Sequence, residues 1–180
     1  HGREYVYEEL EKNFHYFLDQ ISKTALDCGV TLALHPNDPP LDAIGGISCL
    51  VNSKDNYDKF FSTYNSEILG MEFCCGCWLE GGDKFGNLLS SLKEYILDDR
   101  VKIVHFRNVS STLPRFTETF LDNGYMDMNE IIKILIDIGY SGTLTMDHTP
   151  KLVDFAGAEW GGEAYAIGYM RGLSKRQKTL

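Results

Sequence analysis

The chain has 180 residues, 43% of them hydrophobic, which fits one globular domain spanning residues 1–180. Its 26 acidic and 17 basic residues give a formal charge of −9, which argues against nucleic acid or an anionic membrane as a partner and favours a small molecule. The sequence has no apolar run long enough for a membrane span and no secretion leader. Five cysteines, an odd number, do not suggest a disulfide framework, so we expect a reducing, cytoplasmic location.

Helices and strands alternate along the predicted chain. Apolar residues at steps of three and four predict a first helix over residues 4–27, which Gly29 ends in a left-handed conformation. The next predicted elements, in chain order, are a strand over Thr31–His35, a helix over 54–64, a strand over Leu69–Cys74, a helix over 85–97, a strand over Val101–Phe106, a helix between Asp127 and Gly139, a strand over Thr143–Asp147 and a helix over 162–173. The polar tail over residues 174–180 is expected to be frayed.

The helix between Asp127 and Gly139 has the clearest local signals. Asp127 is placed to cap its first turn, and Glu130 follows three residues later to complete a capping box. Met126 and Ile131 can form the hydrophobic staple that often accompanies such a box. These signals predict a well-defined start for this helix.

The order of the elements predicts the fold. Val101–Phe106 is almost uniformly apolar, which indicates burial on both faces, as in a parallel sheet covered by helices. Strands that alternate with helices require parallel pairing and right-handed crossovers. We therefore predict an α/β fold of the TIM-barrel type with four parallel strands. A complete eight-stranded barrel needs about 250 residues, so the preferred interpretation is the C-terminal half of such a barrel, with an open four-stranded sheet as the alternative.

Each predicted strand ends in a potential metal ligand. Because the carboxyl ends of parallel strands converge at one face of a barrel, these side chains can meet although they are distant in sequence. Imidazole, thiolate and carboxylate groups together suit iron, manganese or zinc, whereas calcium and magnesium prefer oxygen ligands throughout. Any one of these residues alone also fits an ordinary structural role, but the set of four favours a metal site. The predicted ligands are His35, Cys74, His105 and Asp147.

Four neighbours of these ligands are candidates for binding or proton transfer. His148 is a candidate acid–base group if the strand end turns it toward the barrel mouth. Arg107 and Asn108 could hold an anionic or hydroxylated substrate, with Arg107 donating two N–H groups to a carboxylate. Asp38, in a turn stiffened by prolines, could orient a ligand or a water molecule. Each also has an ordinary structural alternative: a polar loop position for His148, a salt bridge for Arg107, and an Asx turn for Asp38.

Several motifs together resemble a known family. The segments HPNDPP, FCCG, HFRNV, GYMDM and MDH, in this order and at these spacings, resemble the C-terminal half of the mannonate dehydratase family of xylose-isomerase-like barrels, over residues 25–173. The resemblance implies a metal-dependent lyase that converts D-mannonate to 2-keto-3-deoxy-D-gluconate, with Mn²⁺ or Fe²⁺ as the usual cofactor and Zn²⁺ as a further candidate. The family's metal ligands fall on the four strand-end residues, and its proposed acid–base histidine falls on His148.

Three segments depart from the family pattern, and one of them is HPND, where Asn37 replaces the usual aspartate although Asp38 remains. The family tyrosine after the Asp-His pair has no counterpart, since Tyr165 and Tyr169 fall in the last predicted helix, and the usual TGSLG after the cysteine is CGCWLEGG. Three functions therefore remain open: a sugar-acid dehydratase, a metal-dependent sugar isomerase or epimerase of the same barrel group, and a non-enzymatic half-barrel that binds a partner. The strand edges of a half-barrel would need covering, so we expect a homo-oligomer or completion by an N-terminal half.

Overall fold

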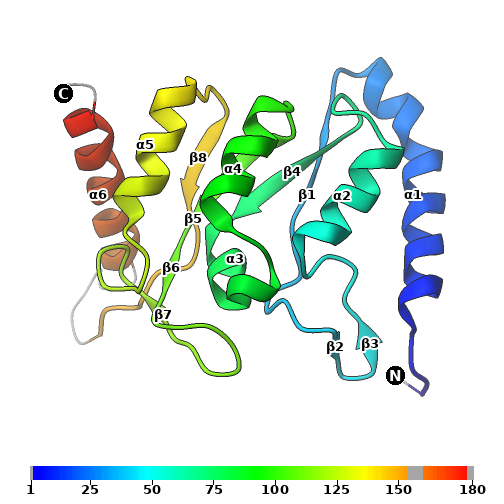
Figure 1. Cartoon of the computed structure of the whole chain (residues 1–180), viewed down its shortest axis with the longest axis horizontal. Helices are drawn as coiled ribbons and strands as arrows, with labels where there is room; N and C mark the ends of the chain where they lie inside the picture. Colours follow the sequence, from blue (N-terminus) through cyan, green and yellow to red (C-terminus); the bar gives the residue numbers. More distant parts are fainter. Residues whose placement is uncertain (1, 154–159, 178–180) are drawn as a thin grey trace.

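A parallel sheet of four strands is the centre of the structure, a computed structural model that describes residues 2–153 and 160–177. The strand order β1-β4-β5-β8 follows the chain, so each new strand is added beside the previous one (Figure 1). This arrangement confirms the predicted α/β fold with four parallel strands. The strands are β1 (Leu32–Leu34), β4 (Leu69–Cys74), β5 (Val101–Phe106) and β8 (Thr143–Met146).

Helices and two short hairpins connect these strands. The helices are α1 (Tyr7–Asp27), α2 (Lys54–Thr63), α3 (Cys75–Gly81), α4 (Leu88–Leu97), α5 (Met128–Ile138) and α6 (Gly161–Gln177), with a 3₁₀ turn, η1 (Gly82–Lys84), between α3 and α4. The hairpins are β2 (Ala43–Ile44) with β3 (Ile47–Ser48), and β6 (Asn108–Val109) with β7 (Glu118–Thr119). Both hairpins lie at the end of the molecule where β4 and β5 terminate (Figure 1).

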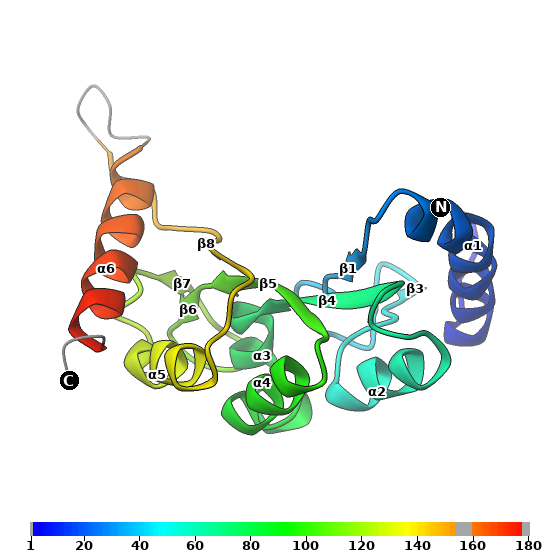
Figure 2. The same ribbon diagram turned by 90° about the horizontal axis from the view of Figure 1, so that it is seen from above.

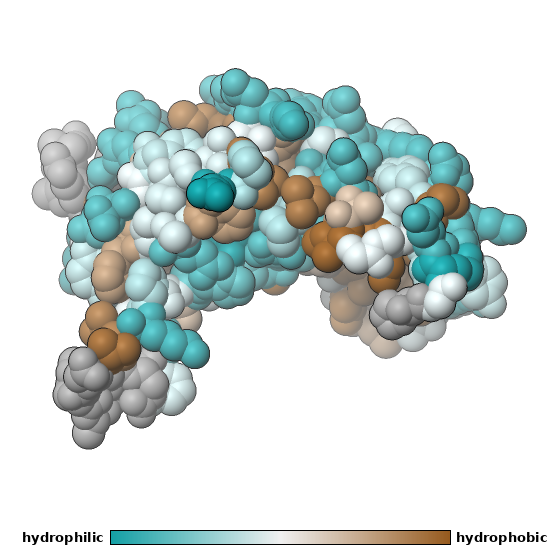
Figure 3. Space-filling view, turned by 90° about the horizontal axis from the view of Figure 1, so that it is seen from below, coloured by the Kyte–Doolittle hydropathy of each residue, from teal (hydrophilic) through white to brown (hydrophobic). Residues whose placement is uncertain are grey.

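The sheet is curved and has two unlike faces. Helices α2, α4 and α5 cover its convex face, whereas its concave face opens between α1 and α6 (Figure 2). Because side chains alternate along a strand, Val104 and Phe106 of β5 are buried on one face, while Ile103 and His105 on the other face are partly exposed. The prediction that helices bury both faces is therefore wrong for this chain. A space-filling view from the end that carries the hairpins shows this concave face as a hollow, with apolar surface on both sides of it (Figure 3).

Several element boundaries differ from those predicted. The two central strands, β4 and β5, have the predicted bounds, but the helix predicted over 85–97 begins at Leu88 because Asn87 caps it by accepting a hydrogen bond from the Ser90 N–H. The seven-residue helix α3 was not predicted. Helix α6 continues to Gln177 instead of ending near residue 173, and the remainder of the predicted frayed tail, 178–180, lies outside the described residues.

Helix α5 has the predicted ends. The Asp127 carboxylate accepts a hydrogen bond from the Asn129 N–H at 2.9 Å and caps the first turn. Gly139 ends the helix in the left-handed region at a φ of 74°, and Gly29 does the same after α1 at a φ of 65°. The local signals thus place these helix ends correctly.

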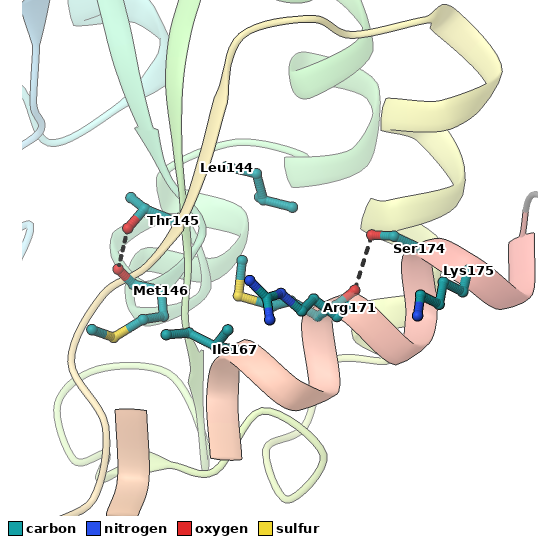
Figure 4. A pocket seen from close by; sticks show the side chains of 8 residues that line it. Leu144, Thr145, Met146, Ile167, Arg171, Ser174 and Lys175 are labelled. Atoms are coloured by element: carbon teal, nitrogen blue, oxygen red, sulfur yellow. Dashed lines mark hydrogen bonds between the residues drawn. The ribbon is translucent and has the colours of Figure 1, made fainter. Parts of the chain in front are cut away.

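One pocket is lined by none of the predicted ligands. It has a volume of about 700 Å³ and lies between β8 and α6, where Leu144, Met146 and Ile167 line it beside Arg171 (Figure 4). None of the predicted ligands or substrate-binding residues lines it. Within the part of the chain that the structure describes, no helix is long and apolar enough to cross a membrane.

Candidate metal centre

The four predicted metal ligands lie together at the carboxyl ends of the strands. Donor atoms of Cys74, His105 and Asp147 all lie within 4.8 Å of one another, and donor atoms of His35 and Cys74 are within the same distance, together with that of Cys77. The rings of His35 and His105 have centroids 5.3 Å apart. The side chains therefore converge as the argument from strand ends predicts, and their function as ligands remains a prediction.

Strand register accounts for this convergence. Cys74 of β4 is paired with His105 of β5, and His105 is paired with Thr145 of β8. Asp147 lies two residues beyond Thr145, so its side chain points to the same face of the sheet. As a result, the Asp147 Oδ2 atom lies 3.5 Å from Cys74 Sγ and 3.5 Å from His105 Nδ1.

Each imidazole has one nitrogen fixed by a partner and the other directed at the cluster. His35 Nδ1 is 2.6 Å from the Pro36 carbonyl oxygen, and His105 Nε2 contacts the Glu72 carboxylate. His105 Nδ1 is buried without a hydrogen-bond partner among the described residues and lies 3.5 Å from Asp147 Oδ2. Metal-binding histidines typically use a backbone carbonyl or a carboxylate in this way to orient the ring. The donor set therefore fits a divalent transition metal.

The electrostatics of the cluster favour anionic ligands. The pKa of the Cys74 thiol lies well below its ordinary value, chiefly because of the hydrogen bond with Cys77 and in spite of burial. Burial alone would raise the pKa of Asp147, but His105 and Arg107 lower it to about 2. For His105, burial opposes the charge, yet Asp147 and Cys74 raise its pKa to about 10. The sulfur and the carboxylate are thus held in the forms that bind metals.

Arg107 is a fully buried cation among carboxylates, directly beside the cluster. Its Nη2 atom lies 2.7 Å from Glu80 and 2.9 Å from Asp38, and its Nη1 atom lies 3.0 Å from Glu118. Its Nε atom is 3.2 Å from Asp147 Oδ2. The guanidinium predicted to grip a substrate is therefore already engaged with four acidic side chains. We infer that it holds the rim of the site together.

Asn108 has a structural position instead of the predicted substrate-facing one. Its side chain is buried, and its Nδ2 atom donates to the Leu121 and Met126 carbonyl oxygens, both at 2.9 Å. Its Oδ1 atom accepts from the N–H groups of Val109 and Met126. These bonds use both amide hydrogens and both oxygen lone pairs, so the amide fastens the loop after β7 and has no further group for a ligand.

His148 and Asp38 flank the cluster from two sides. His148 is 56% exposed, with Nδ1 at 2.7 Å from Glu118 and Nε2 at 3.5 Å from Asp147 Oδ1. Its contact with Glu118 raises its pKa above the ordinary histidine value. The strand end has therefore turned His148 toward the same rim as Asp147. Asp38 is 28% exposed and is paired with Arg107.

Four acidic or thiol groups of this region were not predicted. Glu72 lies two residues before Cys74, and strand alternation could have placed it on the same face. Cys77 and Glu80 stand three residues apart on α3, a spacing that brings side chains to one side of a helix. Glu118 begins the short strand β7, far along the chain from the predicted ligands of β4 and β5, and carries no local sequence signal that points to this site.

Comparison with known proteins places these features in a family. The family model of D-mannonate dehydratase (UxuA) matches residues 3–179. A mannonate dehydratase of Streptococcus pneumoniae (strain 70585) is 30% identical over 164 residues, covering 90% of this chain and 42% of the relative. One from Oceanobacillus iheyensis is 29% identical over 193 residues, covering 99% of this chain and 52% of the relative. The chain thus spans about half the length of the curated relatives it matches.

Solved structures agree with this assignment. The crystal structure of mannonate dehydratase from Streptococcus suis serotype 2 matches with a TM-score of 0.86 and 27% identity, covering 97% of this chain and 51% of that chain. A xylose isomerase domain protein from Planctomyces limnophilus and an L-ribulose 3-epimerase match with TM-scores of 0.67 and 0.62, at 18% and 16% identity. At those identities the latter two likenesses concern the fold alone. They indicate about half of a xylose-isomerase-like barrel.

Proposed function

Because this chain belongs to the D-mannonate dehydratase family, we propose that it forms the metal-binding half of a sugar-acid dehydratase. The reaction would convert D-mannonate to 2-keto-3-deoxy-D-gluconate and water. The observation that carries this proposal is the convergence of two imidazoles, a thiolate and a carboxylate at the carboxyl ends of four strands. Strand ends at that face are where barrel enzymes carry their reacting groups.

In this proposal a divalent cation is bound by His35, Cys74, His105 and Asp147, with Mn²⁺ or Fe²⁺ as the first candidates and Zn²⁺ as the third. When bound, the cation supplies Lewis-acid stabilisation for the charge that develops on the substrate's carboxylate and adjacent oxygen. Support comes from the orientation of the rings, since Pro36 and Glu72 leave one nitrogen of each imidazole directed at the cluster. The four ligands come from four different strand ends, so a folded sheet is required for binding.

The dehydration needs two proton transfers beside the cation. One removes the proton from the carbon next to the carboxylate, and the other protonates the departing hydroxyl on the following carbon. His148 is the proposed group for one of them, since it is half exposed and its Nε2 atom faces Asp147 at the rim. Asp38 and Arg107 lie on the same rim, where the partly exposed Asp38 is the more accessible of the pair for a substrate hydroxyl.

In this proposal, a second half-barrel closes the open side of the site. β1 and β8 are the edge strands of the sheet, and the concave face between α1 and α6 is open (Figure 2). An open sheet edge tends to pair with another strand. This second half would be either an N-terminal half-barrel or a second copy of this chain. The mass of the purified chain in solution, measured by light scattering, distinguishes these sources, because only the second copy predicts a dimer of the 180-residue chain.

Metal content tests the proposed site directly. We expect about one transition-metal ion per chain by elemental analysis, and loss of that ion in both His105→Ala and Asp147→Ala, because each removes one ligand. The control is His15→Ala, since His15 lies on α1 against Tyr64 and belongs to none of the described donor groups. Circular dichroism should show unchanged helix content in all three variants. Full metal retention by both site variants would refute the ligand assignment.

Product analysis tests the proposed reaction. The metal-loaded protein should form a 2-keto-3-deoxy acid from D-mannonate and should give no product from matched aldoses or ketoses. The control is the His148→Gln variant, which keeps a polar side chain at the rim but cannot exchange a proton. Epimer or isomer formation without any keto-deoxy acid would contradict the dehydratase assignment and favour the isomerase group.

A further inference from the structure

A second buried sulfur lies beside the four proposed ligands. Cys77, in the first turn of α3, is fully buried, and its Sγ atom lies within 4.8 Å of Cys74 Sγ and of a ring nitrogen of His35. Both sulfurs also face Arg107 Nη2. Since α3 begins at Cys75, directly after the strand that ends in Cys74, one short segment delivers both sulfurs to the same point.

From this arrangement we infer that Cys77 is a further ligand of the proposed metal ion, so that the site selects Zn²⁺ over Mn²⁺. The inference rests on the proposed metal centre and deepens it by moving Zn²⁺, the third candidate when only four ligands are counted, to first place. The donor atoms of His35, Cys74 and Cys77 lie within 4.8 Å of one another, and Cys74 also shares a group with His105, so ligation by Cys77 would give two sulfurs and two imidazole nitrogens with Cys74 at the centre of the set. A donor set of two sulfurs and two nitrogens is characteristic of zinc, whereas manganese prefers oxygen ligands.

The surroundings can accommodate the additional negative charge. Arg107 Nη2 lies 3.8 Å from Cys74 Sγ and 3.5 Å from Cys77 Sγ, so one guanidinium faces both sulfurs. Coordination to a cation deprotonates a thiol outright, and the proton leaves to solvent on binding. Asp147 already has Arg107 Nε at 3.2 Å as a partner, so its carboxylate is compensated whether it lies inside or just outside the coordination sphere.

The chain also contains a matched control thiol. Cys75 lies between the two sulfurs in sequence and is fully buried as well. It belongs to none of the donor groups found among residues 2–153 and 160–177. Replacing Cys75 therefore removes a buried thiol from the same segment without removing a proposed ligand.

Counting sulfurs on the bound metal tests the inference in the unaltered protein. The 180-residue chain is loaded with Zn²⁺ under a phosphine reductant, which keeps both thiols free, and X-ray absorption at the zinc edge gives the number of sulfur neighbours at about 2.3 Å. Two sulfurs are expected. A single sulfur would overturn the inference while leaving the proposed metal centre in place. Absence of bound zinc would overturn both.

Affinities of two variants give an independent measurement. In competition with a chromophoric chelator, Cys77→Ala should bind Zn²⁺ at least about 100-fold more weakly, because loss of a ligand should cost no less than loss of an outer partner. Its affinity for Mn²⁺ should change by less than about threefold, since manganese gains little from a thiolate. Cys75→Ala should retain both affinities. An unchanged zinc-to-manganese ratio in Cys77→Ala would overturn the inference, and if that variant does not fold, the sulfur count decides.

Discussion

The guanidinium of Arg107 lies directly against the backbone of Gly76 in α3. A Cβ atom at position 76 would come within 1.8 Å of Arg107 Nε and within 2.5 Å of its Cζ atom. Since the Arg107 side chain has no exposed surface and is held by acidic partners, it cannot withdraw into solvent. The absence of a side chain at Gly76 is therefore what allows α3 and the strand-end arginine to pack together.

We expect Gly76→Ala to lower the free energy of unfolding by about 1–3 kcal/mol, because the added methyl group overpacks a buried site. This effect opposes the usual preference of a helix for alanine over glycine, which amounts to about 1 kcal/mol. Urea unfolding followed by circular dichroism measures the change. The matched control is Gly168→Ala in α6, where nothing lies within 4 Å of the added Cβ, and it should be neutral or stabilising. Equal effects at the two positions would contradict the close contact.

Removing the charge of Arg107 should lower the free energy of unfolding by more than Gly76→Ala does. Glu80 is fully buried, and burial raises its pKa to about 8 even with Arg107 beside it. At pH 9, where this carboxyl is ionised in the unaltered protein, Arg107→Met leaves it without its cation, and we expect a loss of about 3–5 kcal/mol in the free energy of unfolding. The double variant Arg107→Met with Glu80→Gln should recover part of that loss, since no buried charge remains at position 80. A double variant less stable than Arg107→Met alone would show that Glu80 does not depend on this pairing.

Glu72 should control metal affinity without itself binding the metal. Its carboxylate contacts His105 Nε2 and orients the ring. Glu72→Gln keeps the size of the side chain but loses the charge, so we expect metal affinity to fall about 10–100-fold, as is typical for outer partners of metal-binding histidines. Chelator competition measures the change. Glu94→Gln on α4 replaces a carboxylate paired with Lys54 away from the cluster and should leave affinity unaltered.

The cap of α5 provides a prediction about stability alone. Asp127→Ala removes the oxygen that accepts from the Asn129 N–H, and we expect it to cost about 1 kcal/mol with no change in metal content. The control is Asp137→Ala near the other end of the same helix, where a carboxylate opposes the helix dipole and its removal should not destabilise. Identical unfolding curves for Asp127→Ala and the unaltered protein would mean that the cap contributes nothing.

The sequence was most informative where one local signal dominates. β4 and β5 match their predicted bounds because each is a short, largely apolar run of six residues, a length typical of a buried strand and too short for a helix. Asp127 and Gly139 mark the ends of α5 because capping chemistry is local. The convergence of the four ligands could also be predicted, since it follows from parallel strands and one polar residue at each strand end.

The remaining features depend on contacts between distant segments. Helix α3 has seven residues, too few for a hydrophobic period to appear, so Cys77 and Glu80 could not be placed. Asn108 follows the strand of His105 and was therefore expected at the site, but the carbonyl groups of Leu121 and Met126 bind its amide. The hydrogen-bond partner of a buried polar group depends on the path of the loop that supplies it, and no local sequence pattern predicts that path.

The alternation along β4 has an evolutionary consequence. Met71 and Phe73 are buried in the core, whereas Glu72 contacts His105 at the rim of the proposed metal site. An exchange at position 72 would therefore alter the partner of His105 while the packing of Met71 and Phe73 stays the same. The cysteine-rich segment after β4 is where further exchanges of donor residues would be expected.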